Sequence, residues 1–387
     1  MTLRALRLWS FLIRFRLPRG PHRRPRIARF SGRAPPSCSP LLGEPDVSSP
    51  DLYNRRFFLF SGKGGVGKTT LAAAFALSCA RRGERTLLME LNVKGKISTL
   101  FGAGEVDHEI REVDDNLYAV NVTPAAAMRE YALMILKIKL VYRAVFENRI
   151  VSSFLKVIPG LNELVMLGKA YYHVNETDEA GRPKWDKIIV DAPATGHGIF
   201  FLKIPSVITS LVKSGLMFEE ARRILDLLQD PERTAINLVT LAEDMPVNET
   251  LELARVVREE MGVPIGVVLA NAVYRPLFDE AQVAHLNEAH AALQAAADAG
   301  DKHAEAHPAS GFLEAARFRN ARVAMQQEYL DLLREKADAP MVEVPFYFHD
   351  RMSFATIDEI AEHLSRELPA LANPAEDAAD RSSSSAG

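Results

Sequence analysis

The sequence predicts an α/β fold, a doubly wound and mostly parallel sheet with helices on both faces. Two observations predict it. Short β-rich runs at 57–60, 86–90, 117–122, 187–190, 235–240, 263–270 and 341–345 are separated by helical stretches. Most of these runs are apolar, as is typical of strands buried on both faces of a parallel sheet. Ligands of such a sheet bind at the carboxyl ends of its strands.

Composition indicates how the chain is organised. With 387 residues, 48% hydrophobic and 25% charged, it can bury a large core. We expect one domain at 51–368. Residues 1–50 form a basic leader, with ten Arg and no acidic residue in the first 43, which we interpret as a disordered arm or a mis-assigned start rather than a transit peptide. Residues 369–387 are expected to be a disordered tail.

Several classes of function are excluded. The only cysteines are Cys38 and Cys79, so neither a disulfide framework nor a Cys/His metal cluster is expected. No run reaches 18 uninterrupted apolar residues, so no membrane-spanning segment is expected. We expect no nucleic-acid partner.

The first predicted strand, 57–60, is followed by the glycine-rich loop SGKGGVGKTT at 61–70 and by a helix over Thr69–Arg82. This is the context of a Walker A loop. Its glycines let backbone N–H groups turn toward one anion, and the helix N-terminus adds its positive dipole end. Lys68 would reach the phosphates, and the Thr69 hydroxyl would join a Mg²⁺ shell. The expected nucleotide-binding residues of the loop are Gly62, Gly64, Gly65, Val66, Gly67, Lys68, Thr69 and Thr70. The alternative is a glycine-rich turn that binds nothing.

Lys63 is a second lysine in a loop that already has its cation at Lys68. Its side chain should point away from its own nucleotide, and in a two-fold dimer it would reach the partner's triphosphate. The motif KGGVGKTT resembles the deviant Walker A loop of the MinD/ParA/ArsA class of ATPases. A solvated loop lysine is the alternative.

The run KIIVDAPATGHG ends a predicted strand on Asp191, where a Walker B carboxylate would hold Mg²⁺. A helix N-cap is the alternative for this residue. The motif is similar to D-T-A-P-T-G-H of the ArsA family, and the resemblance covers about 55–368. It implies ATP and Mg²⁺ as ligands and a dimer that changes shape with nucleotide state.

The resemblance also implies a site for the base. The run GVVLANAV matches the family's strand ending in Asn, so Asn271 would recognise adenine, and Pro345 and Phe346 of VEVPFY would flank the base. A lone Asn at a strand end is more often a turn former.

Two departures from the family pattern bear on activity. Alignment of TLLMELNVKGKISTLFG places Asn92 at the position of the switch I Asp that orients the attacking water, with Glu90 two residues earlier. Asn orients water but cannot accept its proton, so we expect slow hydrolysis or dependence on Glu90 or a partner subunit. Arsenite and a zinc-clasped dimer are disfavoured, because both need cysteines that the core lacks.

A helical insertion at about 125–175 is the expected effector region, because its apolar surface is wider than one stripe. By resemblance it lies where a relative binds a client transmembrane helix; burial in the fold or dimer interface is equally open. The sequence therefore predicts a cytoplasmic ATPase, membrane-associated only through a partner, that couples nucleotide state to a protein. The alternatives are a module that captures hydrophobic helices and a slow regulatory subunit paired with a catalytic paralogue.

Overall fold

The computed structural model describes residues 52–91, 95–104, 106–136, 160–193, 195–301, 303, 307–349 and 351–370. They contain one eight-stranded sheet of order β3-β4-β2-β5-β1-β6-β7-β8. All neighbouring strands pair in parallel except β3 with β4. The strands are β1 (Phe57–Ser61), β2 (Thr86–Leu91), β3 (Arg111–Asp114), β4 (Leu117–Val122), β5 (Lys187–Asp191), β6 (Thr234–Leu241), β7 (Ile265–Val273) and β8 (Met341–Pro345).

This architecture confirms the predicted fold class, and each of the seven predicted strands is present within two or three residues at its ends. The additional strand, β3, has the sequence REVD and is largely exposed at one edge of the sheet. It lacks the apolar run by which the buried strands are recognised.

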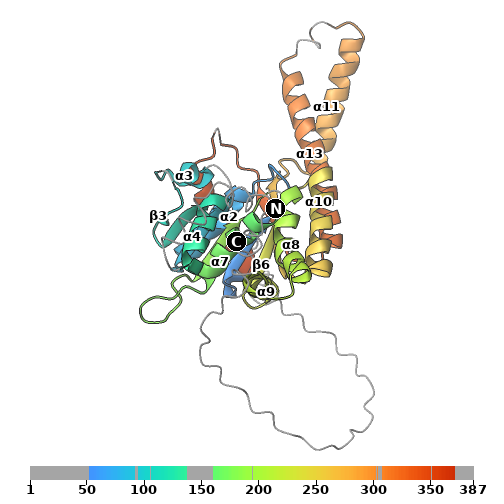
Figure 1. Cartoon of the computed structure of the whole chain (residues 1–387). Coiled ribbons are helices and arrows are strands. Elements are labelled where there is room, and N and C mark those ends of the chain that lie inside the picture. The colour runs from blue at the N-terminus through green and yellow to red at the C-terminus, as the bar shows by residue number, and fades with distance from the viewer. Residues whose placement is uncertain are drawn as a thin grey trace, which may run out of the picture.

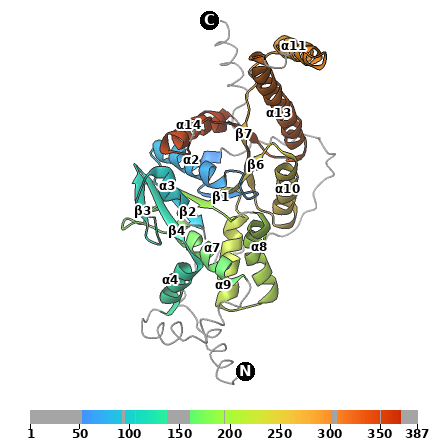
Figure 2. The ribbon, with the colours of Figure 1, turned by 90° about the horizontal axis from the view of Figure 1, so that it is seen from above.

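Helices cover both faces of the sheet (Figure 2). Side chains alternate along β1, so Phe58 and Phe60 enter one hydrophobic core, whereas Phe57 and Leu59 enter the other. The first core is completed by α2 (Lys68–Arg81), α3 (Lys96–Phe101) and α14 (Phe354–Ala370). The second core is completed by α7 (Leu161–Val174), α8 (Thr195–Leu211), α9 (Leu216–Leu228), α10 (Asp244–Arg255) with its π-helical extension Val256–Glu260, and the C-terminal part of α13 (Ala309–Lys336).

A helical hairpin between β7 and β8 projects from the body of the molecule (Figure 1). It is formed by α11 (Glu280–Asp298) and α13 (Ala309–Lys336), which pack against each other. No residue of α11 is buried. The sequence prediction did not include this hairpin, because its apolar positions are mostly alanines and give only a weak helical stripe.

The predicted insertion at 125–175 is described only at its two ends. These are α4 (Pro124–Leu136) and α7, which contact each other. Residues 137–159, which carry part of the apolar surface that the sequence assigned to an effector, lie outside the described residues, so that assignment stays a prediction. Among the described helices, none combines the length and the apolar character needed to cross a bilayer.

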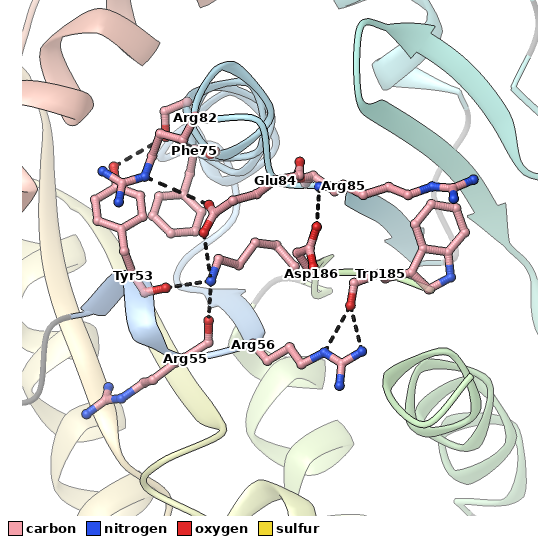
Figure 3. A network of polar contacts seen from close by, with 12 residues as sticks. Tyr53, Arg55, Arg56, Phe75, Arg82, Glu84, Arg85, Trp185 and Asp186 are labelled. Carbon is pink, nitrogen blue, oxygen red and sulfur yellow. Dashed lines mark hydrogen bonds and ion pairs between the residues drawn. The ribbon is translucent and has the colours of Figure 1, made fainter. Parts of the chain in front are cut away.

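The segment that precedes β1 is anchored at the end of the sheet where β1 begins (Figure 3). Tyr53, in a 3₁₀ turn over Leu52–Asn54, is 2% exposed and stacks on Phe75 of α2. The buried Lys187 ammonium donates to the carbonyl oxygens of Tyr53 (2.5 Å) and Arg55 (3.0 Å) and pairs with Glu84. A buried cation is stable only when its donors are satisfied, so this segment belongs to the folded domain.

Candidate nucleotide-binding site

The glycine-rich loop joins the carboxyl end of β1 to the N-terminus of α2, as the sequence predicts. Gly62, Gly65 and Gly67 have φ of 150°, 87° and 95°. A Cβ on Gly62 would lie 2.1 Å from the Val239 carbonyl oxygen on β6, so only glycine fits there. Gly64 and Gly65 are exposed and Val66 is buried, which leaves the backbone of the loop tip open to a ligand.

Lys68 opens α2, with Thr69 and Thr70 behind it in the first turn. Its side chain is mostly buried, and Nζ donates to the Lys63 carbonyl oxygen at 2.8 Å, so the ammonium lies within the curve of the loop. Burial lowers the pKa of Lys68, an effect that the nearby Asp191 carboxylate opposes. A desolvated cation held against backbone carbonyls gains most from a phosphate beside it.

Thr69 and Asp191 meet as a Mg²⁺ site requires. The Thr69 hydroxyl donates to Asp191 Oδ2 at 2.6 Å, although the two residues lie 122 positions apart. Asp191 Oδ1 is buried and has no hydrogen-bond partner among the described residues. Burial raises the pKa of Asp191, partly offset by Thr69 and Lys68. Two oxygen ligands beside a phosphate loop suit Mg²⁺, which completes its shell with phosphate and water. The described residues contain no group of three or more His, Cys, Asp or Glu able to hold a metal ion.

Glu90 lies next to Asp191 in the sheet, because the two residues are register partners of β2 and β5. It is fully buried; Oε1 accepts the Lys96 backbone N–H (3.0 Å) and Oε2 accepts Asn121 Nδ2 (3.3 Å). Burial raises the pKa of Glu90, and the charge of Asp191 adds to this effect. Asn92, which the sequence places at the switch I position, lies outside the described residues.

Lys63 is paired within its own chain. Its ammonium lies 2.5 Å from Glu249 Oε1 on α10, and the two side chains are 26% and 37% exposed. Glu249 has no role predicted from the sequence, because 186 residues separate it from Lys63. The Glu-Thr pair in the motif MPVNETLEL is the signal that could have drawn attention to it.

Asn271 contacts the loop directly. Its Nδ2 donates to the Val66 carbonyl oxygen at 2.9 Å, and a Cβ on Gly67 would lie only 2.3 Å from the same Nδ2. The strand does not end at Asn271, as the sequence suggested, but continues to Val273 through a register shift against β8. Asn271 lies between the two register pairs that flank this irregularity, and its carboxamide faces the loop.

The predicted base-flanking residues follow at the neighbouring strand end. Pro345 ends β8, and the Phe346 N–H donates to the Val273 carbonyl oxygen. The half-exposed Phe346 ring stacks on Tyr274 at a centroid distance of 4.9 Å and packs edge-on against Phe348. The structure thus places an aromatic cluster in the segments that follow β7 and β8, three residues or more beyond Asn271 along β7.

Fold and loop together define a P-loop nucleotide-binding protein. Residues 55–217 match the family described as anion-transporting ATPase. The chain is 34% identical over 225 residues to ATPase BagA of Mycobacterium tuberculosis, covering 57% of this chain and 66% of that protein. It is 27% identical over 307 residues to a putative arsenical pump-driving ATPase of Halobacterium salinarum (75% and 41%), and 26% identical over 182 residues to ATPase GET3 of Kluyveromyces lactis (45% and 52%).

These matches support an ATPase of the ArsA family. The chain spans just under two thirds of the length of the mycobacterial relative and about half of the fungal one.

Proposed function

We propose that this protein binds ATP with Mg²⁺ through the loop at 62–70 and hydrolyses it in a nucleotide-dependent dimer. The hydrogen bond between Thr69 and Asp191 carries the proposal, because it joins the loop helix to the end of β5. A strand-end carboxylate with one buried, unpartnered oxygen is costly unless a cation binds there.

The residues have separate roles in this proposal. The loop backbone and Lys68 hold the phosphates, Thr69 and Asp191 hold Mg²⁺, and Asn271 with Phe346 holds the adenine. When bound, the metal neutralises charge on the phosphates. Lys63 leaves Glu249 and reaches the triphosphate of a partner subunit, where a cation stabilises charge that develops during transfer.

Turnover is slow in the isolated protein. Glu90 is poorly placed to take a proton from the attacking water, since its side chain is fully buried and both of its oxygens accept hydrogen bonds inside the fold. With Asn at position 92, water is oriented without a general base near it. If hydrolysis is so slow that ATP is bound but not turned over, the protein acts as a regulatory subunit that pairs with a catalytic paralogue.

One surface favours coupling to an apolar partner as a second candidate function. Phe200, Val207 and Leu211 are exposed and share one side of α8, the helix that follows Asp191 after a short loop. The affinity of this side of α8 for a hydrophobic helix would then depend on which nucleotide is bound. An apolar helical peptide that binds the Mg·ATP form more tightly than the ADP form supports this candidate, and equal binding refutes it.

Thermal melting tests nucleotide binding. At about 100 times its dissociation constant, a ligand that binds only the folded state adds roughly 2.7 kcal/mol of stability. We expect this increase with Mg·ATP for the wild type and none for Lys68→Ala. Lys336→Ala, at the far end of α13, is the matched control and should respond as the wild type does. An equal increase in all three proteins refutes the assignment.

A further inference from the structure

Strand β7 contains a bulge at the residue that contacts the loop. Ala270 pairs with Glu343 of β8, and three residues later Val273 pairs with Pro345, so β7 has one extra residue over this interval. The extra backbone is strained, because Ala272 has φ of 57°. Asn271 lies inside this bulge, and its direction depends on the bulge.

Gln326 of the projecting hairpin braces the bulge. Its Nε2 donates to the Ala272 carbonyl oxygen (3.0 Å) and its Oε1 accepts the Tyr274 N–H (2.8 Å). The residue is 3% exposed. The carboxamide thus serves as hydrogen-bond partner for backbone groups on the C-terminal side of Asn271. A carboxylate would accept from Tyr274 but could not donate to Ala272, and an aliphatic side chain would do neither.

Neighbouring residues of α13 contact the ends of the adjoining strands. The Arg319 guanidinium lies 5.1 Å from the Tyr274 ring centre and 5.2 Å from that of Phe348, and it donates to the Arg275 carbonyl oxygen. Arg322 pairs with Glu243 at the N-cap of α10. The base of the hairpin is therefore fixed to the segments that follow β6, β7 and β8.

The contact between Asn271 and the loop sets which atom faces a base. The Val66 carbonyl oxygen accepts only a donor, so Nδ2 must point to it. Oδ1 is then the atom left for a ligand. An acceptor there receives a hydrogen bond from the exocyclic amine of adenine and opposes the carbonyl oxygen of guanine.

We propose that Gln326 is a positioning residue that sets the base selectivity of the nucleotide site by bracing the bulge that carries Asn271. This inference rests on the proposed function, since it concerns the nucleotide held there. The bulge carries the base contact, whereas the phosphates are held by the loop at 62–70. Asn271 also bonds the loop at Val66, but the loop backbone and Lys68 stay in place without the brace, so its loss affects recognition of the base far more than phosphate binding.

Calorimetric titration of the full chain tests the proposal with four probes, each with Mg²⁺: ATP, GTP, ADP and inorganic tripolyphosphate. We expect the wild type to prefer ATP over GTP by about tenfold or more. Gln326→Leu should reduce this preference to about threefold or less, with tripolyphosphate affinity within about twofold of the wild type. The control is Gln327→Leu, one residue along α13, where the exposed side chain donates to Asp331, and its titrations should match the wild type.

A double-mutant cycle separates positioning from general support. If Gln326 acts through Asn271, then Gln326→Leu added to Asn271→Ala produces no further loss of selectivity. Should Gln326→Leu not fold, Gln326→Glu, which keeps the acceptor for Tyr274, is titrated in its place with the same expectations. Unchanged selectivity, or an equal loss for ATP, GTP and tripolyphosphate, overturns the proposal. A wild type that binds none of the nucleotides refutes the proposed function instead.

Discussion

The ion pair between Lys63 and Glu249 predicts that Glu249→Gln strengthens the nucleotide-dependent dimer. Lys63 lies 2.5 Å from Glu249 within one chain, so it must leave this partner before it reaches another subunit's triphosphate. The substitution removes the charge of the carboxylate and keeps the size of the side chain. It therefore lowers the free-energy cost of releasing Lys63.

The magnitude follows from the exposure of the pair. Both side chains are partly exposed, 26% for Lys63 and 37% for Glu249. Pairs of this kind contribute up to about 1 kcal/mol. A two-fold dimer releases two lysines, so the gain in dimerisation free energy is at most about 2 kcal/mol, or up to roughly 30-fold in the dimer dissociation constant.

Sedimentation velocity across a range of protein concentrations measures this constant with Mg²⁺ and a non-hydrolysable ATP analogue. Glu252→Gln is the matched control, because it removes an exposed carboxylate from the same helix, α10, without touching Lys63. Dimerisation of Glu249→Gln that equals or falls below that of Glu252→Gln refutes the reasoning. If the wild type, Glu249→Gln and Glu252→Gln all stay monomeric with the ATP analogue, the homodimer itself is ruled out.

Three further predictions concern catalysis, the metal site and the start of the domain. Asn92→Asp should increase single-turnover hydrolysis severalfold at nearly unchanged ATP affinity, and adding Lys63→Ala to that variant should cancel the gain. Fast hydrolysis by the wild type, with no increase in Asn92→Asp, would mean that another group orients the water. Asp191→Asn should abolish the Mg·ATP-dependent rise in melting temperature yet stabilise the ligand-free protein, because burial raises the pKa of Asp191 above its ordinary 3.8. The protonated Asp191 carboxyl stabilises the wild type fully below the ordinary pKa of 3.8, and this stabilisation is lost as pH rises through the raised pKa of the folded state. The melting temperature of Asp191→Asn without nucleotide should therefore exceed that of the wild type by more as pH rises. A difference that shrinks as pH rises contradicts this. A chain that begins at Asp51 should melt like the full chain and bind Mg·ATP. A chain that begins at Arg56 loses Tyr53 and the two carbonyl oxygens that accept hydrogen bonds from Lys187, so it should be less stable by roughly 3 kcal/mol or more. Equal melting temperatures of the two chains would show that the segment contributes nothing to stability.

The sequence was sufficient for seven of the eight strands and for the glycine-rich loop, because these depend on local patterns. Buried strands such as 187–190 are continuous apolar runs, and the loop at 62–70 combines fixed spacing with glycines that have positive φ. The meeting of Thr69 with Asp191 also followed, since parallel strands bring their carboxyl ends to one edge.

The remaining features depend on contacts between distant residues. Gln326 is a polar residue in a helix of mixed character, and nothing in its neighbourhood marks it as the brace of a bulge 54 residues earlier. The bulge itself is invisible in the run VLANAV, where Asn271 reads as the end of a strand. The partner of Lys63 is hidden for the same reason, because a helix glutamate most often faces solvent.

Mixing two inactive variants tests most directly the claim that the site is completed by a second subunit. Lys63→Ala keeps the loop that binds ATP, and Lys68→Ala keeps the lysine that acts on the partner. Lys68→Ala is not expected to bind ATP, so it joins a dimer only beside a Lys63→Ala subunit whose loop holds ATP. At most about half of the dimers are then mixed, each with one complete site, so we predict recovery of up to about one quarter of wild-type hydrolysis in an equal mixture. No recovery above the separate variants, with mixed dimers shown to form in Mg·ATP, would contradict a role for Lys63 across the dimer.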